Sequence, residues 1–347
     1  MNDERTENMS FHVGIMEPKD APGLVELFRA VYGDNYPIKE VYDPEYLVAH
    51  QEKREMYHII ARDPKGKVAG HLALFHTSAP FAGIWELGHG MVLPECRNLN
   101  LNRAMTEYAH LKLVPELGIE QVWGEAVTNH IYMQKTILHL GAGVYETGIE
   151  IDLMPRSSYE KERGVAGRVS AVLTFTTLKA KAQRLFLPGV YDEVIRHIYR
   201  SAPVDFGHTC LEADGSARAE GPSSLRSTLT EAAGVYRVVL LRIGADIRER
   251  MAQTEKEMID QGAVVFQVFV RLTDPLAGVA VEALRACGYF FGGLLPRWFD
   301  DDGVLLQKIV QEPNFKGIQL YSEAAAGLLE FIRADRDEAN RQMSLGN

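Results

Sequence analysis

One segment of the chain joins a strand end, a proline and a run of polar side chains. It reads Met91-Val92-Leu93-Pro94-Glu95-Cys96-Arg97-Asn98-Leu99-Asn100-Leu101-Asn102, and apolar spacing predicts an amphipathic helix from its end. The first turn of a helix exposes unpaired backbone N–H groups and the positive end of the helix dipole, which together bind phosphate. Arg97 could add a charge-assisted hydrogen bond. The segment therefore predicts a pyrophosphate-binding turn.

This segment resembles the signature of the GNAT acetyltransferase superfamily. The family pattern is Val-x-Pro-x-x-Arg/Gln-x-x-Gly-x-Gly/Ala, and Val92, Pro94 and Arg97 occupy its first three fixed positions. The two glycine positions fall on Asn100 and Asn102, which departs from the family. Asparagine tolerates a left-handed backbone better than most residues, so we expect the turn to keep its shape. The resemblance implies coenzyme A binding, with acetyl-CoA as cosubstrate and no metal ion.

The resemblance also implies where the cofactor lies. In the family, the pantetheine arm pairs with the fourth strand where that strand separates from the fifth, and an asparagine often follows the fifth strand. We therefore expect the backbone at 91–93 to bind the cofactor and to place an N–H donor near the oxyanion. The expected cofactor-binding residues are Met91, Val92, Leu93, Arg97, Asn98, Leu99, Asn100, Leu101, Asn102, Arg103 and Asn129.

Acetyl transfer to an amine requires a base, since an amine attacks a thioester carbonyl only when it is neutral. Glu86 is the candidate base, because it lies on the expected fourth strand, where the family often has a carboxylate. A surface glutamate on an alternating strand is the other interpretation. His89 is the alternative base because an imidazole pKa near 6.5 suits the task. His89 could equally be packed in the core.

The acid that would protonate the leaving thiolate is marked less clearly. The family often has a tyrosine seven residues after the asparagine, and that position is Thr136 here. Tyr132 is the nearby candidate that we prefer, and Tyr145 is the second. Either tyrosine could instead be a core aromatic residue with a hydrogen-bonded hydroxyl.

The elements expected around these residues follow the family order. Periodicity and turn residues predict a strand (Phe11–Met16), two helices (20–33 and Pro44–Glu55), three strands (Tyr57–Ala61, Val68–His76, Ile84–Leu93), the Leu101–Leu111 helix, a strand (Gln121–Val127) and a helix (Ile131–Leu140). Glycines at 83, 88 and 90 predict a bulge in the fourth strand.

The second half of the chain repeats the order of the later elements. The strand Ala263–Leu272, a helix and Cys287-Gly288-Tyr289 echo Gln121–Val127, its helix and Leu140-Gly141. Chance recurrence in an α/β protein is the alternative. The polar stretch Arg156–Arg168 predicts a boundary between domains at 10–155 and 165–340. Only Ile243-Gly244-Ala245 precedes the second helix start, so we expect no coenzyme A there.

We therefore predict an α/β (α+β) fold of tandem GNAT-like domains, each with a mixed, mostly antiparallel sheet flanked by helices. The first domain would be an N-acetyltransferase whose acceptor is an amine of a small molecule or a protein. The second, degenerate domain would shape the acceptor site or mediate formation of a homodimer. The alternative is a non-catalytic sensor or scaffold that binds acyl-CoA, and a purely structural protein is a third hypothesis.

Composition restricts the partners of this 347-residue chain. Lys and Arg number 37 against 47 Asp and Glu, and the net charge of −10 argues against nucleic acid or an anionic membrane as a partner. It favours a cationic acceptor. Three separated cysteines and the lack of a secretory signal predict a cytoplasmic protein. The eleven histidines show no metal-ligand spacing, and Asp300-Asp301-Asp302 is expected to be a solvated turn.

Overall fold

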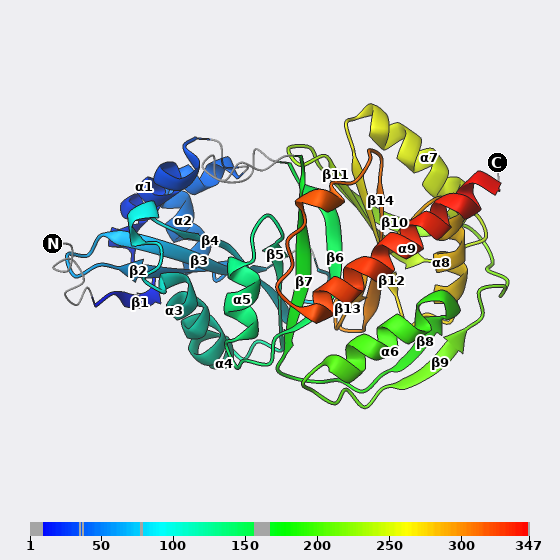
Figure 1. Ribbon diagram of the computed structural model, residues 1–347, viewed down its shortest axis with the longest axis horizontal. Helices are drawn as coiled ribbons and strands as arrows, with labels where there is room; N and C mark the ends of the chain where they lie inside the picture. The colour runs from blue at the N-terminus through cyan, green and yellow to red at the C-terminus, as the bar shows by residue number, and fades with distance from the viewer. Residues whose placement is uncertain (1–9, 35, 37, 77–78, 156–166, 346–347) are drawn as a thin grey trace.

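One continuous sheet of twelve strands runs through the molecule. The computed structural model describes residues 10–34, 36, 38–76, 79–155 and 167–345. The strand order is β1-β2-β3-β4-β5-β7-β6-β13-β14-β12-β11-β10, and β8 and β9 form a separate parallel pair. The molecule is elongated, with the N-terminal elements at one end and the C-terminal helix at the other (Figure 1).

The large sheet is built from β1 (His12–Ile15), β2 (Met56–Arg62), β3 (Val68–His76), β4 (Ile84–Val92), β5 (Gln121–Val127), β6 (Tyr145–Met154), β7 (Val169–Thr177), β10 (Ser224–Thr230), β11 (Val235–Arg242), β12 (Val265–Arg271), β13 (Phe290–Leu295) and β14 (Gly303–Ile309). The small pair is β8 (Arg184–Pro188) and β9 (Thr209–Ala213). The helices are α1 (Ala21–Tyr32), α2 (Pro44–Glu52), α3 (Leu101–Tyr108), α4 (Val114–Glu116), α5 (Tyr132–Leu138), α6 (Asp192–Ser201), α7 (Ile247–Asp260), α8 (Ala277–Ala286) and α9 (Glu323–Leu345). None of the helices in the described ranges is long and apolar enough to cross a membrane.

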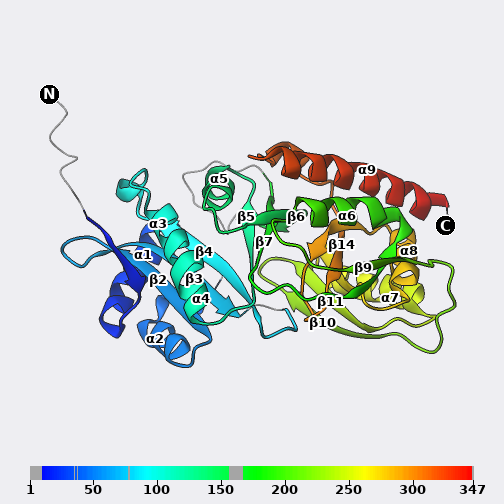
Figure 2. The ribbon, with the colours of Figure 1, turned by 90° about the horizontal axis from the view of Figure 1, so that it is seen from below.

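Helix α1 shows how local sequence signals set the elements of the first half. Pro22 lies in its first turn, and Gly33 ends it with a positive φ of 62°, which glycine adopts without strain. Its apolar stripe, including Leu24 and Phe28, is fully buried. Helices α1 and α2 cover one face of the N-terminal strands and α3 covers the other (Figure 2).

The strand Val169–Thr177 corrects the predicted division of the chain. It forms β7, which lies between β5 and β6 and is antiparallel to both. A boundary between 155 and 165 would separate β7 from the two strands that supply its hydrogen bonds. Most of the polar stretch on which that boundary rested, residues 156–166, lies outside the described residues. We therefore use "first half" for residues 10–177 and "second half" for residues 178–345.

The second half repeats the topology of the first. Its strand order β10-β11-β12-β14-β13 matches β3-β4-β5-β7-β6, and the pairing directions match throughout, including one parallel pair in each (β4 with β5, β11 with β12). Helix α7 lies between the parallel strands in sequence, as α3 does in the first half. The internal repeat predicted from the sequence is therefore present. The segment between α6 and β10 contains a further strand, β9.

The two halves join where β6 meets β13. Gly148 pairs with Gly293, and a Cβ on Gly148 would lie 2.1 Å from the carbonyl oxygen of Gly292. Beyond this contact the carboxamide of Gln307 continues the hydrogen bonding: its Nε2 donates to the Ile149 oxygen (2.9 Å), and its Oε1 accepts from the Ile151 N–H (2.8 Å). Glycine is therefore required at the join because the two backbones touch.

The sheet curves so strongly that β5 and β11 face each other. These strands are six positions apart in the sheet, about 29 Å if the sheet were flat. Nevertheless Trp123 of β5 belongs to the same buried cluster as Val239 of β11 and Phe269 of β12. We call the face that carries these side chains the inner face. Helices α3, α5, α6 and α9 lie on the opposite, outer face (Figure 2).

Substitution of Gly148 by alanine is expected to destabilise the join. The new methyl group would overlap the backbone of β13, and overpacking of this kind costs about 1–3 kcal/mol. The measurement is the thermal unfolding midpoint. The control is Gly327→Ala in α9, where the added methyl meets no atom within 4 Å and should raise helix stability. Equal midpoints for wild type and Gly148→Ala would contradict the proposed constraint.

Candidate functional site

The parallel strands β4 and β5 part after three residue pairs. Ile84 pairs with Gln121, Trp85 with Val122 and Glu86 with Trp123, and no β5 residue pairs with β4 beyond Glu86. On its other side β4 stays paired with β3 as far as Val92. The edge of β4 after Glu86 therefore turns toward a gap rather than toward a strand.

A bulge lies in β4 beside this gap, as the glycines predicted. Between the His71–Met91 and Ala73–Gly88 pairs, β4 has one residue more than β3. His89 takes up the extra length with a φ of +55°, a left-handed value that is uncommon outside glycine. The bulge re-aims the strand toward the turn that precedes α3.

The turn after β4 adopts a glycine-like backbone. Asn98 has a φ of +72° and Asn100 a φ of +58°, so both asparagines are left-handed. Asn100 is the residue before α3, and its side chain makes no capping hydrogen bond. The first-turn N–H groups of α3, at Leu101, Asn102 and Arg103, have no acceptor within the helix. The turn thus offers backbone donors that the helix itself does not satisfy.

The side chain of Asn102 lies over the β4 edge. Its Nδ2 lies 3.4 Å from Met133 Sδ on α5, and its Oδ1 lies 3.7 Å from the place a Cβ on Gly90 would take. The carboxamide therefore lies between α3, α5 and the end of β4. The Asn102 side chain therefore leaves less space for a ligand along the β4 edge. Asn100 contributes the left-handed backbone of the turn.

The other expected cofactor residues divide into buried and exposed sets. Met91, Leu93 and Leu101 are buried and fix the strand and helix, whereas Val92 and Arg97 are half-buried and Asn98 and Leu99 are exposed. Arg103 forms an exposed ion pair with Glu107 (2.8 Å). Asn129 follows β5, and its carbonyl accepts from Gln319 of the second half (3.2 Å). The structure thus gathers most of these residues at the β4–α3 junction and places Asn129 beside α5.

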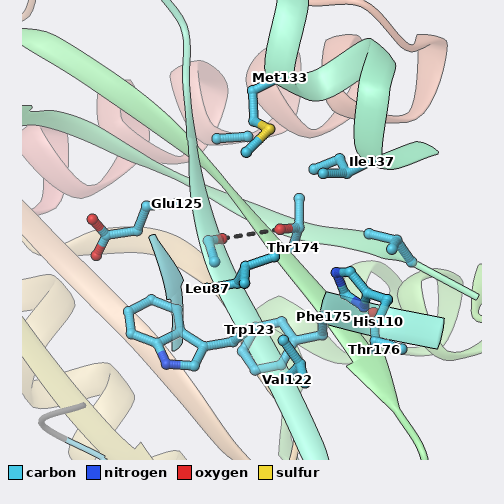
Figure 3. A pocket seen from close by; sticks show the side chains of 13 residues that line it. Leu87, His110, Val122, Trp123, Glu125, Met133, Ile137, Thr174, Phe175 and Thr176 are labelled. Atoms are coloured by element: carbon cyan, nitrogen blue, oxygen red, sulfur yellow. Dashed lines mark hydrogen bonds between the residues drawn. The ribbon is translucent and has the colours of Figure 1, made fainter. Parts of the chain in front are cut away.

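A small hollow of about 30 Å³ lies beside the gap, lined mainly by β5, β7 and α5. Met133 and Ile137 of α5 lie over it on the outer face, and Leu87 of β4 lines it (Figure 3). Glu125 and Trp123 point away from these side chains (Figure 3), because successive residues of a strand alternate between its faces. The gap therefore has an outer side next to α3 and α5 and an inner side that carries polar groups.

Glu86 lies on the inner side, at the point where the strands part. It is half-buried, and its Oε1 lies 3.3 Å from the place a Cβ on Gly88 would take, so its carboxylate follows β4 toward the bulge. His89 is packed instead: its ring contacts Phe75 and Tyr36, with centroids 4.7 and 5.7 Å away. Burial lowers the pKa of His89 to about 4. Of the two base candidates, Glu86 therefore has its ionisable group beside the gap, whereas the ring of His89 is packed against aromatic side chains.

The two tyrosine candidates differ in exposure. Tyr132 begins α5 and is 65% exposed, near His130. Tyr145 is buried, and its hydroxyl is 2.7 Å from Thr177 Oγ1. Tyr145 is therefore a core aromatic residue, and its burial raises the pKa of its hydroxyl. Thr136 donates to the Tyr132 carbonyl and points along α5.

Four polar residues on the inner side were not predicted as site residues from the sequence. Glu125 of β5 and Glu150 of β6 lie near Arg237 of β11 and Gln267 of β12. The available signal was a polar residue within an apolar strand: Gln267 interrupts the longest apolar run, and Glu150 lies between isoleucines. These residues are far apart in sequence, so only the curvature of the sheet brings them together.

The acidic turn Asp300-Asp301-Asp302 is not solvated as expected. Asp302 is fully buried, and its carboxylate accepts from Gln183 Nε2 (2.6 Å), the Arg297 N–H (2.9 Å) and Tyr199 Oη (2.5 Å). Asp301 is paired with Lys181 and Arg271. The turn is therefore a structural anchor. In the part of the chain that the structure describes, no group of three His, Cys, Asp or Glu side chains is placed to hold a metal ion.

The turn of the second half that corresponds to the β4–α3 turn is filled by its own chain. A Cβ on Gly244 would lie 2.3–2.5 Å from backbone atoms of residues 221–223. The Gly244 N–H donates to Ser223 Oγ (3.0 Å), and the Ser223 N–H donates to Asp246 Oδ1 (2.6 Å). Backbone thus occupies the space that a phosphate would need in this half.

The first half now matches the arrangement that the resemblance implies. Strand β7 lies between β5 and β6, β4 parts from β5 beside a bulge, and a turn leads from β4 into α3. The first half has a GNAT fold. The second half has the same strand order without counterparts of β1 and β2 in the large sheet.

Comparisons with known proteins found similar solved structures that each cover about half of this chain. Similar solved structures include the ribosomal-protein-S5-alanine acetyltransferase of Vibrio fischeri (14% identity, 49% of this chain and 94% of that chain, TM-score 0.39). Others are the ribosomal-protein-S18-alanine N-acetyltransferase of Escherichia coli (16%, 51% and 100%, 0.38) and a putative acetyltransferase of Acinetobacter baylyi ADP1 (14%, 50% and 94%, 0.41). No family model matches the sequence, and no curated protein does.

Two buried histidines lie behind the bulge of the GNAT half. His71 Nδ1 is 3.0 Å from the His89 carbonyl oxygen, which can only accept, so this nitrogen carries the proton. His71 Nε2 then accepts from His58 Nδ1 (3.0 Å). Burial lowers the pKa of His58 to about 3 and that of His71 well below its usual value. Both rings are therefore neutral in the folded protein at pH 7.

Acid is expected to destabilise the fold through this pair. The folded pKa values lie below the unfolded value near 6.5, so the unfolded state binds more protons as pH falls below 6.5, and stability declines by up to about 1.4 kcal/mol per pH unit for each histidine. Urea unfolding between pH 7.5 and 5 measures this slope. The variant His58→Asn should lose about one histidine's contribution to the slope of unfolding free energy against pH. An unchanged slope in this variant would contradict the assignment of a neutral, buried His58.

Proposed function

We propose that the GNAT half transfers an acetyl group from acetyl-CoA to an amine. The observation that supports this most directly is the parting of β4 from β5 beside a left-handed turn that opens the first turn of α3. One side of the gap offers backbone donors for a cofactor. The other side offers a carboxylate, Glu86, for the acceptor.

The residues present fit coenzyme A on the outer side. The first-turn N–H groups of α3 and Arg97 would hold the pyrophosphate, and the free edge of β4 would hydrogen-bond the pantetheine arm. The hollow there, about 30 Å³, is far below the roughly 300 Å³ of a small ligand pocket, so we expect binding to displace the side chain of Met133. When bound, acetyl-CoA supplies the activated acetyl group.

Glu86 would take the proton from the acceptor amine. It lies on the inner side, its carboxylate follows β4 toward the bulge, and an amine approaching the gap from that side meets it first. A backbone N–H group near Met91 would stabilise the negative charge that develops on the carbonyl oxygen. Tyr132 remains the candidate acid for the departing thiolate, from the exposed start of α5.

Binding of coenzyme A is expected to depend on the backbone at Asn100. Asn100→Gly preserves the left-handed conformation and should keep or raise the affinity. Asn100→Val opposes that conformation at a cost of about 1–2 kcal/mol and should weaken binding about tenfold. Calorimetry with coenzyme A measures both. Equal affinities for the two variants would exclude this turn as the binding site.

Loss of the Glu86 carboxylate is expected to slow turnover. Glu86→Gln should lower kcat by about 10²-fold or more, with partial recovery at high pH, where the amine loses its proton without help. Release of free thiol from acetyl-CoA over a panel of amines measures this, and Glu116→Gln, on the surface helix α4, is the control. Wild-type protein that binds coenzyme A but releases no thiol would instead favour the acyl-CoA sensor.

A further inference from the structure

Three glutamates from three strands of the first half share the inner face. Glu86 of β4 pairs in register with Trp123, and Glu125 follows two residues later on the same face of β5. Glu150 of β6 lies close enough for its charge to interact with those of both Glu125 and Glu86. These carboxylates border the side of the gap that the acceptor would enter.

The second half supplies the countercharge. Arg237 of β11 places its Nη2 3.8 Å from Glu125 Oε1, and its Nε donates to Gln267 Oε1 (2.8 Å). Gln267 Nε2 in turn donates to Glu150 Oε1 (2.6 Å). One guanidinium thus acts on Glu125 directly and on Glu150 through a carboxamide whose orientation it fixes.

The positive charge of Arg237 is important because burial disfavours the ionised forms of Glu125 and Glu150. Glu150 is only 3% exposed, and burial raises its pKa and that of Glu125, while the Arg237 guanidinium opposes the rise at both groups. The charged groups that reach this pair are Glu86 from β4 and Arg237 from β11. Arg237 is therefore the cation that favours ionised carboxylates here.

Glu125 can meet a ligand, and Glu150 cannot. The Glu125 side chain is 16% exposed and that of Arg237 is 26% exposed, so both border solvent. Glu150 is enclosed, and one of its carboxylate oxygens accepts from Gln267. Of these inner-face residues, the Glu125–Arg237 pair is therefore the part that solvent or a ligand can reach.

We propose that Arg237 is a positioning residue of the acceptor site, through which the second half completes the site of the first. This inference rests on the proposed acetyl transfer. Arg237 orients Glu125 and favours its ionised form, and Glu125 serves as the counter-ion that draws the acceptor's ammonium group to the gap, next to Glu86. The second half thus contributes a charge to acceptor binding without binding cofactor itself.

The test compares R237M, R237K and the control R242M, which removes an exposed arginine at the end of the same strand. The readouts are the acceptor KM, the pH profile of kcat/KM and the affinity for coenzyme A. For R237M we expect the acceptor KM to rise about tenfold and the acid limb of the profile to move up by about one pH unit, because the carboxylates lose their cation. Coenzyme A affinity should not change.

The conservative variant separates charge from packing. R237K keeps the charge but loses the planar fork, so it should restore the pH profile and recover the KM only in part. If R237M does not fold, the acceptor KM of R237K decides alone: an increase supports the inference, and a wild-type KM overturns it. If the wild-type protein transfers acetyl groups and R237M has the same acceptor KM and pH profile, this inference is overturned and the proposed function is not. Absence of thiol release from wild type with every amine would instead overturn the proposed function.

Discussion

The contact of bare backbone between β6 and β13 is the constraint on which the rest of the structure depends. Gly148 lies so close to the backbone of Gly292 and Gly293 that a side chain on Gly148 would force the two strands apart. Their contact makes one sheet out of two repeated units, with Gln307 continuing the hydrogen bonding where the strands diverge. The continuous sheet can then curve until β11 faces β5, which brings Arg237 to Glu125. The polar group on the inner face is thus a consequence of how the halves are joined.

The sheet also separates two kinds of chemistry. On the outer face, α3 and α5 flank the free edge of β4 and the turn at Asn98 and Asn100, which suits a phosphate-bearing cofactor. On the inner face, carboxylates converge from several strands, which suits an amine. The gap between β4 and β5 connects the two faces. A reaction between a cofactor and an acceptor that enter from opposite sides would take place in that gap.

The repeated units have diverged at the turn before their first outer helix. In the first half this turn has left-handed asparagines and leads into N–H groups that α3 itself does not satisfy. In the second half the backbone of residues 221–223 lies against Gly244, and Ser223 is tied to Asp246. The same topology therefore carries two different turns at this position. The second half retains β11 and β12, whose inner-face side chains reach the first half.

The sequence by itself determined the local elements and the turn. Proline, glycine and apolar spacing marked α1, the strands β2 to β5 and the β4 bulge, because these signals act over a few residues. Only the tertiary structure decided that β7 inserts between β5 and β6, that Asp302 is buried, and that Glu125, Glu150, Gln267 and Arg237 meet. Those outcomes depend on hydrogen bonds and sheet curvature between segments that can be more than a hundred residues apart. No residue spacing within one segment specifies which distant strand it will pair with.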